Sequence, residues 1–475
     1  MEKDASLNPR RPVSAQNSKR VLVVAYYAPP AGGPAVQRVL QFLQHLTDHG
    51  WQPALLTVRE GAYPNRDASL LEKMPPSVEG RRTASLDPLA LYQRLRRALG
   101  MGEGGLPAGS LGEGASSFFG DFFEKAARWV RANLFVPDAR VGWWPFAVHA
   151  GRQWLREAEA AGRPFDAILS TGAPHSVHLA GRSLHRASGT PWVADLHDPW
   201  TDISYYDEFP HTAPARRLDA HFERSVLEEA TAVTTVSPSW KGLFERKAPG
   251  MRGAVVENGF AEDDFATLGA PDPSGQEHFT IAHVGKLYAS RNPEAFWDAL
   301  ARLRRERAVP KLRVELTGTV DAAARRALAA RGLDEIVEMR PFVEHTEALR
   351  RMARSALLFL AIEPFAQEAG MITSKLYEYL ASGRPVLGWG PPAGDAAALL
   401  ERTGGGRMLA RRDTDGFARF LRMHYDAWAA GAALDGADSE AIRPLTRRAQ
   451  AGRMAALLDG VVAGTSARGK TRLVP

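Results

Sequence analysis

The chain has 475 residues, more than one compact domain usually holds, and its 24% charged and 45% hydrophobic residues are typical of a globular protein. It has no cysteine, which excludes disulfides, thiolate metal sites and cysteine nucleophiles. Sixty lysines and arginines against 54 aspartates and glutamates give a formal charge of +6, a modest excess that suits anionic small ligands or an anionic membrane surface.

Signals for a membrane-spanning helix, for secretion or for nucleic-acid binding are not found in the sequence. No window is a long, charge-free apolar run, since 356–362 is only as long as a strand, and residues 1–20 lack an apolar signal core. We therefore expect a cytoplasmic protein. Zinc-finger spacing, RNA-binding motifs and long basic runs are absent too, so no nucleic-acid partner is expected.

The first half of the chain predicts an open parallel sheet with helices on its faces. After a tail over 1–19, an apolar strand over 20–26 leads into a loop with Gly32 and Gly33, and a helix follows that ends at Gly50. This strand–loop–helix order is typical of α/β domains. Further strands are predicted over 52–58, 165–170, 191–196, 232–236 and 253–256.

Segments rich in glycine, proline and polar residues interrupt this rhythm. We expect a long insertion over 59–117, partly disordered, and a linker between two domains over 266–277. A helix is predicted over 446–463, followed by a disordered tail over 464–475.

A second series of alternating strands and helices follows the linker. Strands are predicted over 279–284, 312–316, 336–339, 356–362 and 386–389. Between the last two, Ile372, Leu376, Tyr379 and Leu380 recur at helical spacing, and Gly383 stands where a helix C-cap glycine belongs. The fold class is therefore α/β, with two open halves.

Polar residues follow several of the first-half strands. Gly32 and Gly33 come after the first strand, where backbone amides can approach an anion, although a simple tight turn explains them equally. His197 and Asp198 follow a later strand, and Asp198 could instead cap a helix that starts at Pro199. His175 is a weaker candidate for the same edge.

In the second half of the chain, cationic residues follow the first predicted strand. Gly285 and Lys286 follow the first strand, with Arg291 one turn later, and two cations so placed suit a diphosphate. On the helix over 370–382, Lys375 and Glu378 share the polar side with Ser374 and Ser382. Solvated surface charges are the alternative for all of these.

Several of these segments resemble family 4 glycosyltransferases of the GT-B class. S-K-L-Y-E-Y-L-A-S-G-R-P-V-L, over 374–387, resembles the donor-nucleotide helix of that family, and G-K-L-Y-A-S-R, over 285–291, resembles its phosphate-binding pattern. D-L-H-D-P-W, over 195–200, resembles a stretch of one bacterial branch, and N-G-F, over 258–260, resembles the turn before the linker. The motifs occur in family order, so the resemblance covers nearly all of 20–462.

The resemblance implies two Rossmann-like domains, over 20–265 and 278–445, facing a cleft, with the last helix crossing back to the first. It also implies transfer of a sugar from a nucleotide diphosphate sugar, without a metal or a cofactor and with retention of configuration. Catalytic roles fall to His197, Asp198, Lys286 and Arg291. The residues expected to bind the donor are Gly32, Gly33, Gly285, Gly370, Met371, Ile372, Ser374, Lys375 and Glu378.

One position departs from the family pattern. Glu378 matches the second glutamate of the family motif, which binds the ribose, but the first glutamate would fall at Gly370. Either Glu368 or Glu363 replaces it, or the backbone amides near Met371 and Ile372 hold the donor sugar.

The acceptor is expected, by analogy alone, to be a lipid-linked or surface polysaccharide intermediate. A sugar-nucleotide 2-epimerase and a non-catalytic nucleotide-sugar-binding subunit are the alternatives. Aromatic and basic residues interleaved over 118–146 fit either a helix at the inner face of the membrane or a helix packed on the first domain.

Overall fold

The computed structural model describes residues 18–61, 63, 65–86, 118–266 and 276–471 of the chain. The chain divides into two compact units. The first contains the residues up to His197, Pro210–Val233 and the residues from Ala451 on; the second contains Asp198–Phe209 and Thr234–Gln450.

The first sheet has seven strands in the order β3-β2-β1-β4-β5-β6-β7. The strands are β1 (Lys19–Val24), β2 (Trp51–Val58), β3 (Glu79–Thr83), β4 (Ala167–Gly172), β5 (Trp192–Leu196), β6 (Ala232–Thr235) and β7 (Gly253–Val255). β1 pairs in parallel with β2 on one side and β4 on the other, and five of its six residues are buried. The sequence-predicted parallel sheet is therefore confirmed.

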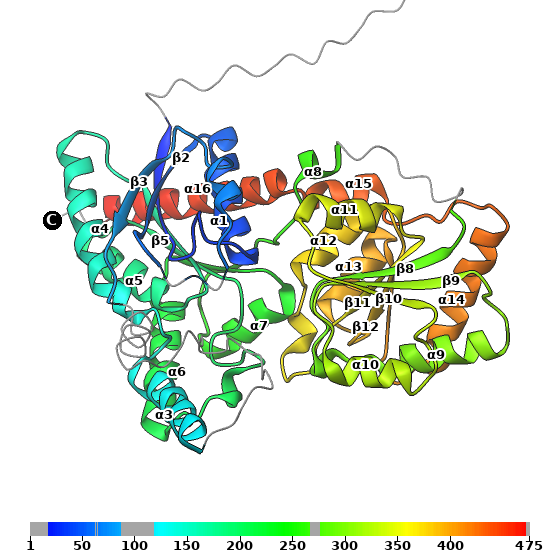
Figure 1. Cartoon of the computed structure of the whole chain (residues 1–475). Coiled ribbons are helices and arrows are strands. Elements are labelled where there is room, and N and C mark those ends of the chain that lie inside the picture. Colours follow the sequence, from blue (N-terminus) through cyan, green and yellow to red (C-terminus); the bar gives the residue numbers. More distant parts are fainter. Residues whose placement is uncertain (1–17, 62, 64, 87–117, 267–275, 472–475) are drawn as a thin grey trace, which may run out of the picture. The chain divides into compact units, whose positions relative to one another are not determined.

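Helices cover this sheet (Figure 1). They are α1 (Pro34–His45), α4 (Trp144–Ala160), α5 (Ser176–Ser188), α6 (Ala213–Glu229) and α16 (Arg447–Thr471), with 3-10 turns η1 (Leu46–His49), η2 (Ala68–Leu71) and η3 (Val141–Trp143). A further helix, α3 (Phe118–Leu134), packs on α6. Apolar residues at helical spacing bury one side of α1, where Val36, Val39, Leu40 and Leu43 are inaccessible to solvent or nearly so.

The expected insertion over 59–117 is partly wrong, because it contains η2 and the strand β3. β3 pairs in parallel with β2, from Ala54 opposite Glu79 to Val58 opposite Thr83. Its sequence, Glu-Gly-Arg-Arg-Thr, has no apolar alternation, since a strand at the edge of a sheet is held by backbone hydrogen bonds and buries little. Residues 87–117 lie outside the described part of the chain.

The second sheet has six strands in the order β10-β9-β8-β11-β12-β13. The strands are β8 (Phe279–Val284), β9 (Leu312–Thr317), β10 (Val337–Arg340), β11 (Leu357–Ala361), β12 (Val386–Trp389) and β13 (Gly406–Leu409). Alternate residues of one strand enter different hydrophobic clusters: Leu357 and Phe359 lie in one, and Leu358 and Leu360 in the other. Both faces are thus buried, as expected of a parallel sheet between helices.

The remaining helices belong to the second unit. They are α7 (Pro238–Lys247), α8 (Glu262–Ala266), α9 (Glu294–Arg305), α10 (Ala322–Ala329), α11 (His345–Arg354), α12 (Ser374–Ala381), α13 (Asp395–Thr403), α14 (Thr414–Ala429) and α15 (Ser439–Ile442), with turns η4 (Tyr206–Glu208), η5 (Ala289–Arg291), η6 (Glu368–Gly370) and η7 (Arg443–Leu445). α9, α10 and α14 share one hydrophobic cluster with the sheet, and α11, α12 and α13 share the other.

The last helix begins in the second unit and continues in the first. Asp459 on α16 accepts hydrogen bonds from Lys19 Nζ at 2.7 Å and from the Trp51 indole at 3.0 Å, so the helix packs beside the first sheet (Figure 1). The crossing helix is therefore confirmed. Its expected end at residue 463 is wrong, because α16 runs to Thr471 through the start of the predicted tail.

No helix within the described ranges is both long enough and apolar enough to cross a membrane.

Candidate functional site

The strand order of each sheet reverses at one point. In the first sheet the chain moves outward from β1 through β2 to β3, and then from β4 in the other direction. In the second sheet the corresponding pair is β8 and β11. Open α/β sheets bind ligands at the carboxyl ends of the strands flanking such a reversal, because the following loops diverge there. The polar side chains at each of these two places are therefore candidate site residues of their own unit.

In the first unit, a buried ion pair joins α1 to the end of β5. The Arg38 guanidinium donates to both carboxylate oxygens of Asp195, from Nε at 2.9 Å and from Nη2 at 2.7 Å. Both side chains are inaccessible or nearly so. Burial alone would raise the Asp195 pKa, but the charge and hydrogen bonds of Arg38 hold the pKa of this carboxyl well below its usual range.

Asp195 in turn positions His197. The His197 Nε2 atom lies 3.1 Å from the carboxylate and 2.8 Å from the Thr171 hydroxyl, which itself donates to Asp195 at 2.6 Å. Because an ionised carboxylate can only accept, the imidazole proton is assigned to Nε2 and Nδ1 is the acceptor. His197 is thus fixed in orientation at the carboxyl end of β5.

The structure also places the other residues predicted at this edge. Gly33 is the N-cap of α1 with φ +108°, and the Gly32 amide donates to the Asn65 carbonyl at 3.0 Å. No helix starts at Pro199, since the next element after Asp198 is η4 at Tyr206, so the predicted helix cap through Pro199 is wrong. His175 stands at the start of α5.

The N-terminus of α5 is capped by a residue that the sequence did not single out. Asp138 accepts from the Ser176 amide at 2.7 Å and from its hydroxyl at 2.9 Å. Burial raises the pKa of Asp138 even though these hydrogen bonds oppose the shift. Asp138 thus fixes the α5 end beside the strand edge that carries Thr171.

In the second unit, Lys375 on α12 lies against the loop that follows β8. Gly285 has φ +123°, and a β-carbon there would be 2.5 Å from Lys375 Nζ. Burial, together with the neighbouring Arg291 charge, lowers the pKa of Lys375 to about 8. The glycine loop and the α12 lysine, far apart in sequence, therefore form one surface.

Two further cations belong to the same loop. Lys286 Nζ and the Arg291 guanidinium lie 5.9 and 5.6 Å from the centre of the Tyr288 ring. Arg291 also pairs with Glu363, which follows β11, at 3.3 Å, and Glu363 accepts from the Ser290 hydroxyl at 2.6 Å. Lys286, Arg291 and Lys375 thus gather positive charge at the β8 and β11 strand ends.

Glu378 lies one turn beyond Lys375 and is held by a partner that the sequence did not indicate. Its carboxylate is 3.0 Å from His345 Nε2, at the start of α11. This hydrogen bond raises the pKa of His345, with help from the nearby Asp264 charge. Glu378 is mostly buried, with 19% of its side chain exposed.

The structure also explains the glycine at position 370. A β-carbon on Gly370 would overlap the Trp240 ring of α7, so no larger residue fits beside that indole. Glu368 is occupied by Arg411, which donates to both of its oxygens, and Glu363 by Arg291 and Ser290. Both carboxylates that could replace a glutamate at 370 thus have arginine partners in the structure.

Of the other residues predicted around Gly370, some pack in the core and others lie in the first turn of α12. The Met371 amide donates to the Glu368 carbonyl at 2.9 Å, and the Ile372 side chain lies in the core. Ser374 is the first residue of α12, so its amide lies in the helix's first turn. Ser382, expected on the polar side, is instead buried and donates to the Tyr379 carbonyl at 2.6 Å.

The aromatic residues of 118–146 that the structure describes differ in exposure. Trp143 is buried and its indole donates to Thr83 at 2.7 Å, whereas Trp129 on α3 is 45% exposed. The side chains of 118–124, which carry four of the predicted aromatics, lie outside what the structure describes. The choice between membrane contact and packing therefore stays open for α3.

Comparisons with known proteins agree with this geometry. Residues 32–259 match the model of the glycosyl transferase 4-like domain, and residues 278–426 match the model of the glycosyl transferases group 1 domain. The two matches fall on the two predicted domains in the expected order. The chain is a GT4-like glycosyltransferase. A search of the curated proteins found no match.

Solved structures show the same fold at low sequence identity. Sucrose-phosphate synthase from Thermosynechococcus elongatus superposes with a TM-score of 0.57 at 16% identity, covering 94% of this chain and 100% of that one. A glycosyltransferase from Rickettsia africae superposes with a TM-score of 0.57 at 11% identity, covering 94% of this chain and 99% of that one. S. aureus TarM superposes with a TM-score of 0.56 at 7% identity, covering 93% of this chain and 100% of that one. The GT-B fold predicted for this glycosyltransferase is thus confirmed.

Proposed function

We propose that this glycosyltransferase takes a sugar from a nucleoside diphosphate sugar and transfers it to a saccharide or lipid-linked acceptor, in the synthesis of a cell-surface polysaccharide or glycolipid. The observation that carries the proposal is the group of cations at the β8 strand end, where Lys375 packs on Gly285 beside Arg291. S. aureus TarM, which shares the fold, was solved in complex with UDP, and this supports a nucleoside diphosphate as the ligand.

The chemistry follows from charge. As the bond between the anomeric carbon and the donor phosphate breaks, the diphosphate gains negative charge, which Lys286, Arg291 and Lys375 neutralise. The acceptor hydroxyl oxygen forms the new bond to that carbon, and its proton passes to the leaving phosphate. We propose that the configuration is retained, as the family resemblance implies. In this scheme the three cations take the place that a metal ion would otherwise fill.

The remaining predicted residues orient the substrates. Glu378 accepts hydrogen bonds from the ribose hydroxyls in place of its present bond to His345. His197, held by Asp195 and Thr171 through Nε2, hydrogen-bonds a sugar hydroxyl through Nδ1. The Ser374 amide at the start of α12 adds a donor for phosphate oxygens. Asp198 is proposed to contact the acceptor.

The test is release of nucleoside diphosphate from a panel of UDP-, GDP- and ADP-sugars, measured with and without saccharide acceptors. A transferase releases diphosphate faster when the acceptor is added. A 2-epimerase converts one donor into its epimer without any acceptor. A protein that binds a nucleotide sugar yet neither releases diphosphate nor epimerises the sugar is a binding subunit, and that result would overturn the proposal.

A further inference from the structure

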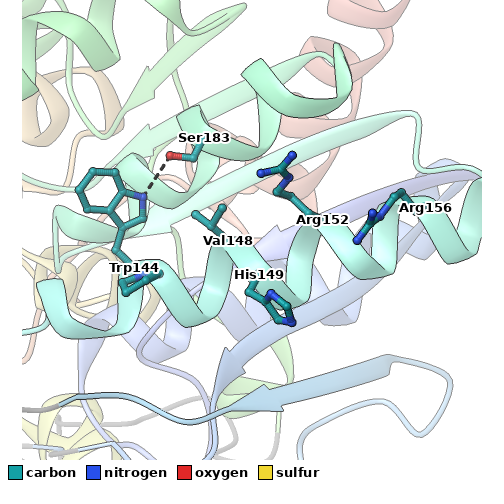
Figure 2. Close-up of a pocket in the computed structure, with 7 residues that line it drawn as sticks. Trp144, Val148, His149, Arg152, Arg156 and Ser183 are labelled. Carbon is teal, nitrogen blue, oxygen red and sulfur yellow. Dashed lines mark hydrogen bonds between the residues drawn. The ribbon is translucent and has the colours of Figure 1, made fainter.

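A groove lies between α4 and α5 of the first unit. Its volume is about 640 Å³, within the range of pockets that hold small ligands. The lining comes from one side of α4, with a single residue from α5: Trp144, Pro145, Val148, His149, Arg152, Arg156 and Ser183. Figure 2 shows Trp144, Val148, His149, Arg152 and Arg156 in order along α4, with Ser183 on the neighbouring helix. None of them takes part in the donor or sugar site proposed above.

One end of the groove is apolar and rigid. The Trp144 indole donates to the Ser183 hydroxyl at 3.1 Å, as the dashed line in Figure 2 marks. Its ring also meets Phe222 of α6 edge-on, with 6.3 Å between the ring centres. Held from two sides, Trp144 offers a fixed apolar surface, which Pro145 and Val148 extend along α4.

The other end of the groove is cationic. Arg152 and Arg156 are one helical turn apart, so their guanidinium groups lie on the same side of α4. Neither forms an ion pair or a hydrogen bond with any residue that the structure describes, although neighbouring Arg81 pairs with Glu157 and Arg186 with Glu229. His149 adds an imidazole, and the lining contains no carboxylate.

A second, smaller hollow of about 290 Å³ lies on the other side of the same two arginines. Its lining includes Glu159, whose charge would repel an anion. An anionic group is therefore better placed at the edge of the larger groove, between Arg152 and Arg156, with its apolar part directed toward Trp144.

We propose that this groove binds a phosphate-bearing amphiphile. The phosphate takes charge-assisted hydrogen bonds from Arg152 and Arg156, and the apolar chain lies along Val148 and Pro145 to the Trp144 ring. Both ends of the groove are needed for affinity, because exposed arginines alone bind a phosphate weakly and a short apolar surface alone binds an apolar chain weakly. This site does not depend on the donor and acceptor chemistry proposed above.

Binding of octyl phosphate to the full chain, measured by isothermal titration calorimetry below micelle-forming concentrations, tests the proposal. Inorganic phosphate and the uncharged amphiphile octyl glucoside probe the two halves of the ligand separately. We expect one octyl phosphate per chain, with each half-ligand bound at least about tenfold more weakly. Equal binding of octyl glucoside, or no binding of octyl phosphate, would overturn it.

Variants locate the site. Arg152→Gln with Arg156→Gln should weaken octyl phosphate binding by about tenfold or more, because both phosphate partners are lost. The matched control is Arg217→Gln with Arg224→Gln, which removes the same charge from two exposed positions of α6 and should leave binding unchanged. An equal loss of octyl phosphate affinity in both double variants would indicate a general effect of charge and would refute binding in this groove.

A third variant separates the apolar end. Val148→Asn should weaken binding of octyl phosphate several-fold while leaving the affinity for inorganic phosphate as it is. All these positions are exposed or half-buried, so far-ultraviolet circular dichroism should match the wild type. Unaltered octyl phosphate binding in Val148→Asn would place the apolar chain elsewhere and contradict the assignment.

Discussion

Lys375 occupies the space that a side chain at Gly285 would need, since a β-carbon there would lie 2.5 Å from Lys375 Nζ. The backbone at Gly285, with φ +123°, is in a region that favours glycine as well. The loop after β8 and the first turn of α12 are thus fitted to each other. Several properties of the second unit should depend on this contact.

Gly285→Ala should displace the Lys375 ammonium and weaken binding of the best nucleoside diphosphate among UDP, GDP and ADP by about tenfold, a loss of about 1.4 kcal/mol. Gly404→Ala is the matched control, because Gly404 also has positive φ, at +63°, but has open space around it. Calorimetric titration should show weakened binding only in Gly285→Ala. Similar affinities in the two variants would show that Lys375 does not bind the phosphate groups.

Nucleoside diphosphate binding should weaken as pH rises through about 8. Burial lowers the pKa of Lys375 to about 8, so its ammonium is charged below this pH and neutral above it. The dissociation constant should therefore increase between pH 7 and pH 9. Lys375→Arg should shift this increase to higher pH, because a guanidinium keeps its charge. A wild-type affinity that does not change over this range would contradict the assignment.

Glu378→Gln should reduce nucleoside diphosphate affinity by about tenfold, since a neutral amide is a weaker acceptor for ribose hydroxyls. The same substitution lowers the pKa of His345 toward its ordinary value, because the carboxylate that raises it is removed. Nuclear magnetic resonance titration of the imidazole measures this shift directly. Glu401→Gln, on the exposed side of α13, is the control and should change neither quantity.

Arg38→Met should lower the free energy of unfolding by about 3–5 kcal/mol, because it leaves the Asp195 carboxylate buried without its partner. Replacing both members, as in Arg38→Met with Asp195→Asn, should recover part of this loss. Urea denaturation monitored by tryptophan fluorescence provides the measurement. A single variant as stable as the wild type would show that the pair contributes nothing to folding.

Stability should fall as pH is lowered from 6.5 toward 3. Burial lowers the pKa of His178 to about 3, so between these values the unfolded chain binds a proton that the folded chain does not. This contribution to stability is complete above pH 6.5 and is lost as pH falls. His178→Asn keeps a polar group near Ser170, which bonds the histidine at 2.9 Å, but removes the titration. A smaller decrease in unfolding free energy between pH 7 and pH 5 is expected in this variant.

The order of strands and helices could be read from the sequence because its signals are local. Apolar runs of strand length, and glycines at turns, act within a few residues, and β8 and β12 have the predicted bounds. β3 and β13, two strands that were not predicted, both lie at a sheet edge. Glu79–Thr83 is held there by backbone pairing with β2, which leaves no hydrophobic pattern.

By itself, the sequence determined which residues are candidates for the site: motifs and their order indicate His197, Lys286 and Arg291 after strands, and Lys375 and Glu378 on a helix. Only the tertiary structure decided their partners. Arg38 pairs with Asp195, which is 157 residues away in the sequence, and His345 hydrogen-bonds Glu378. The Trp240 ring leaves no space for a side chain at position 370. The pattern within a segment reports burial, whereas the pairing of charges between distant segments depends on how loops and helices bring them together.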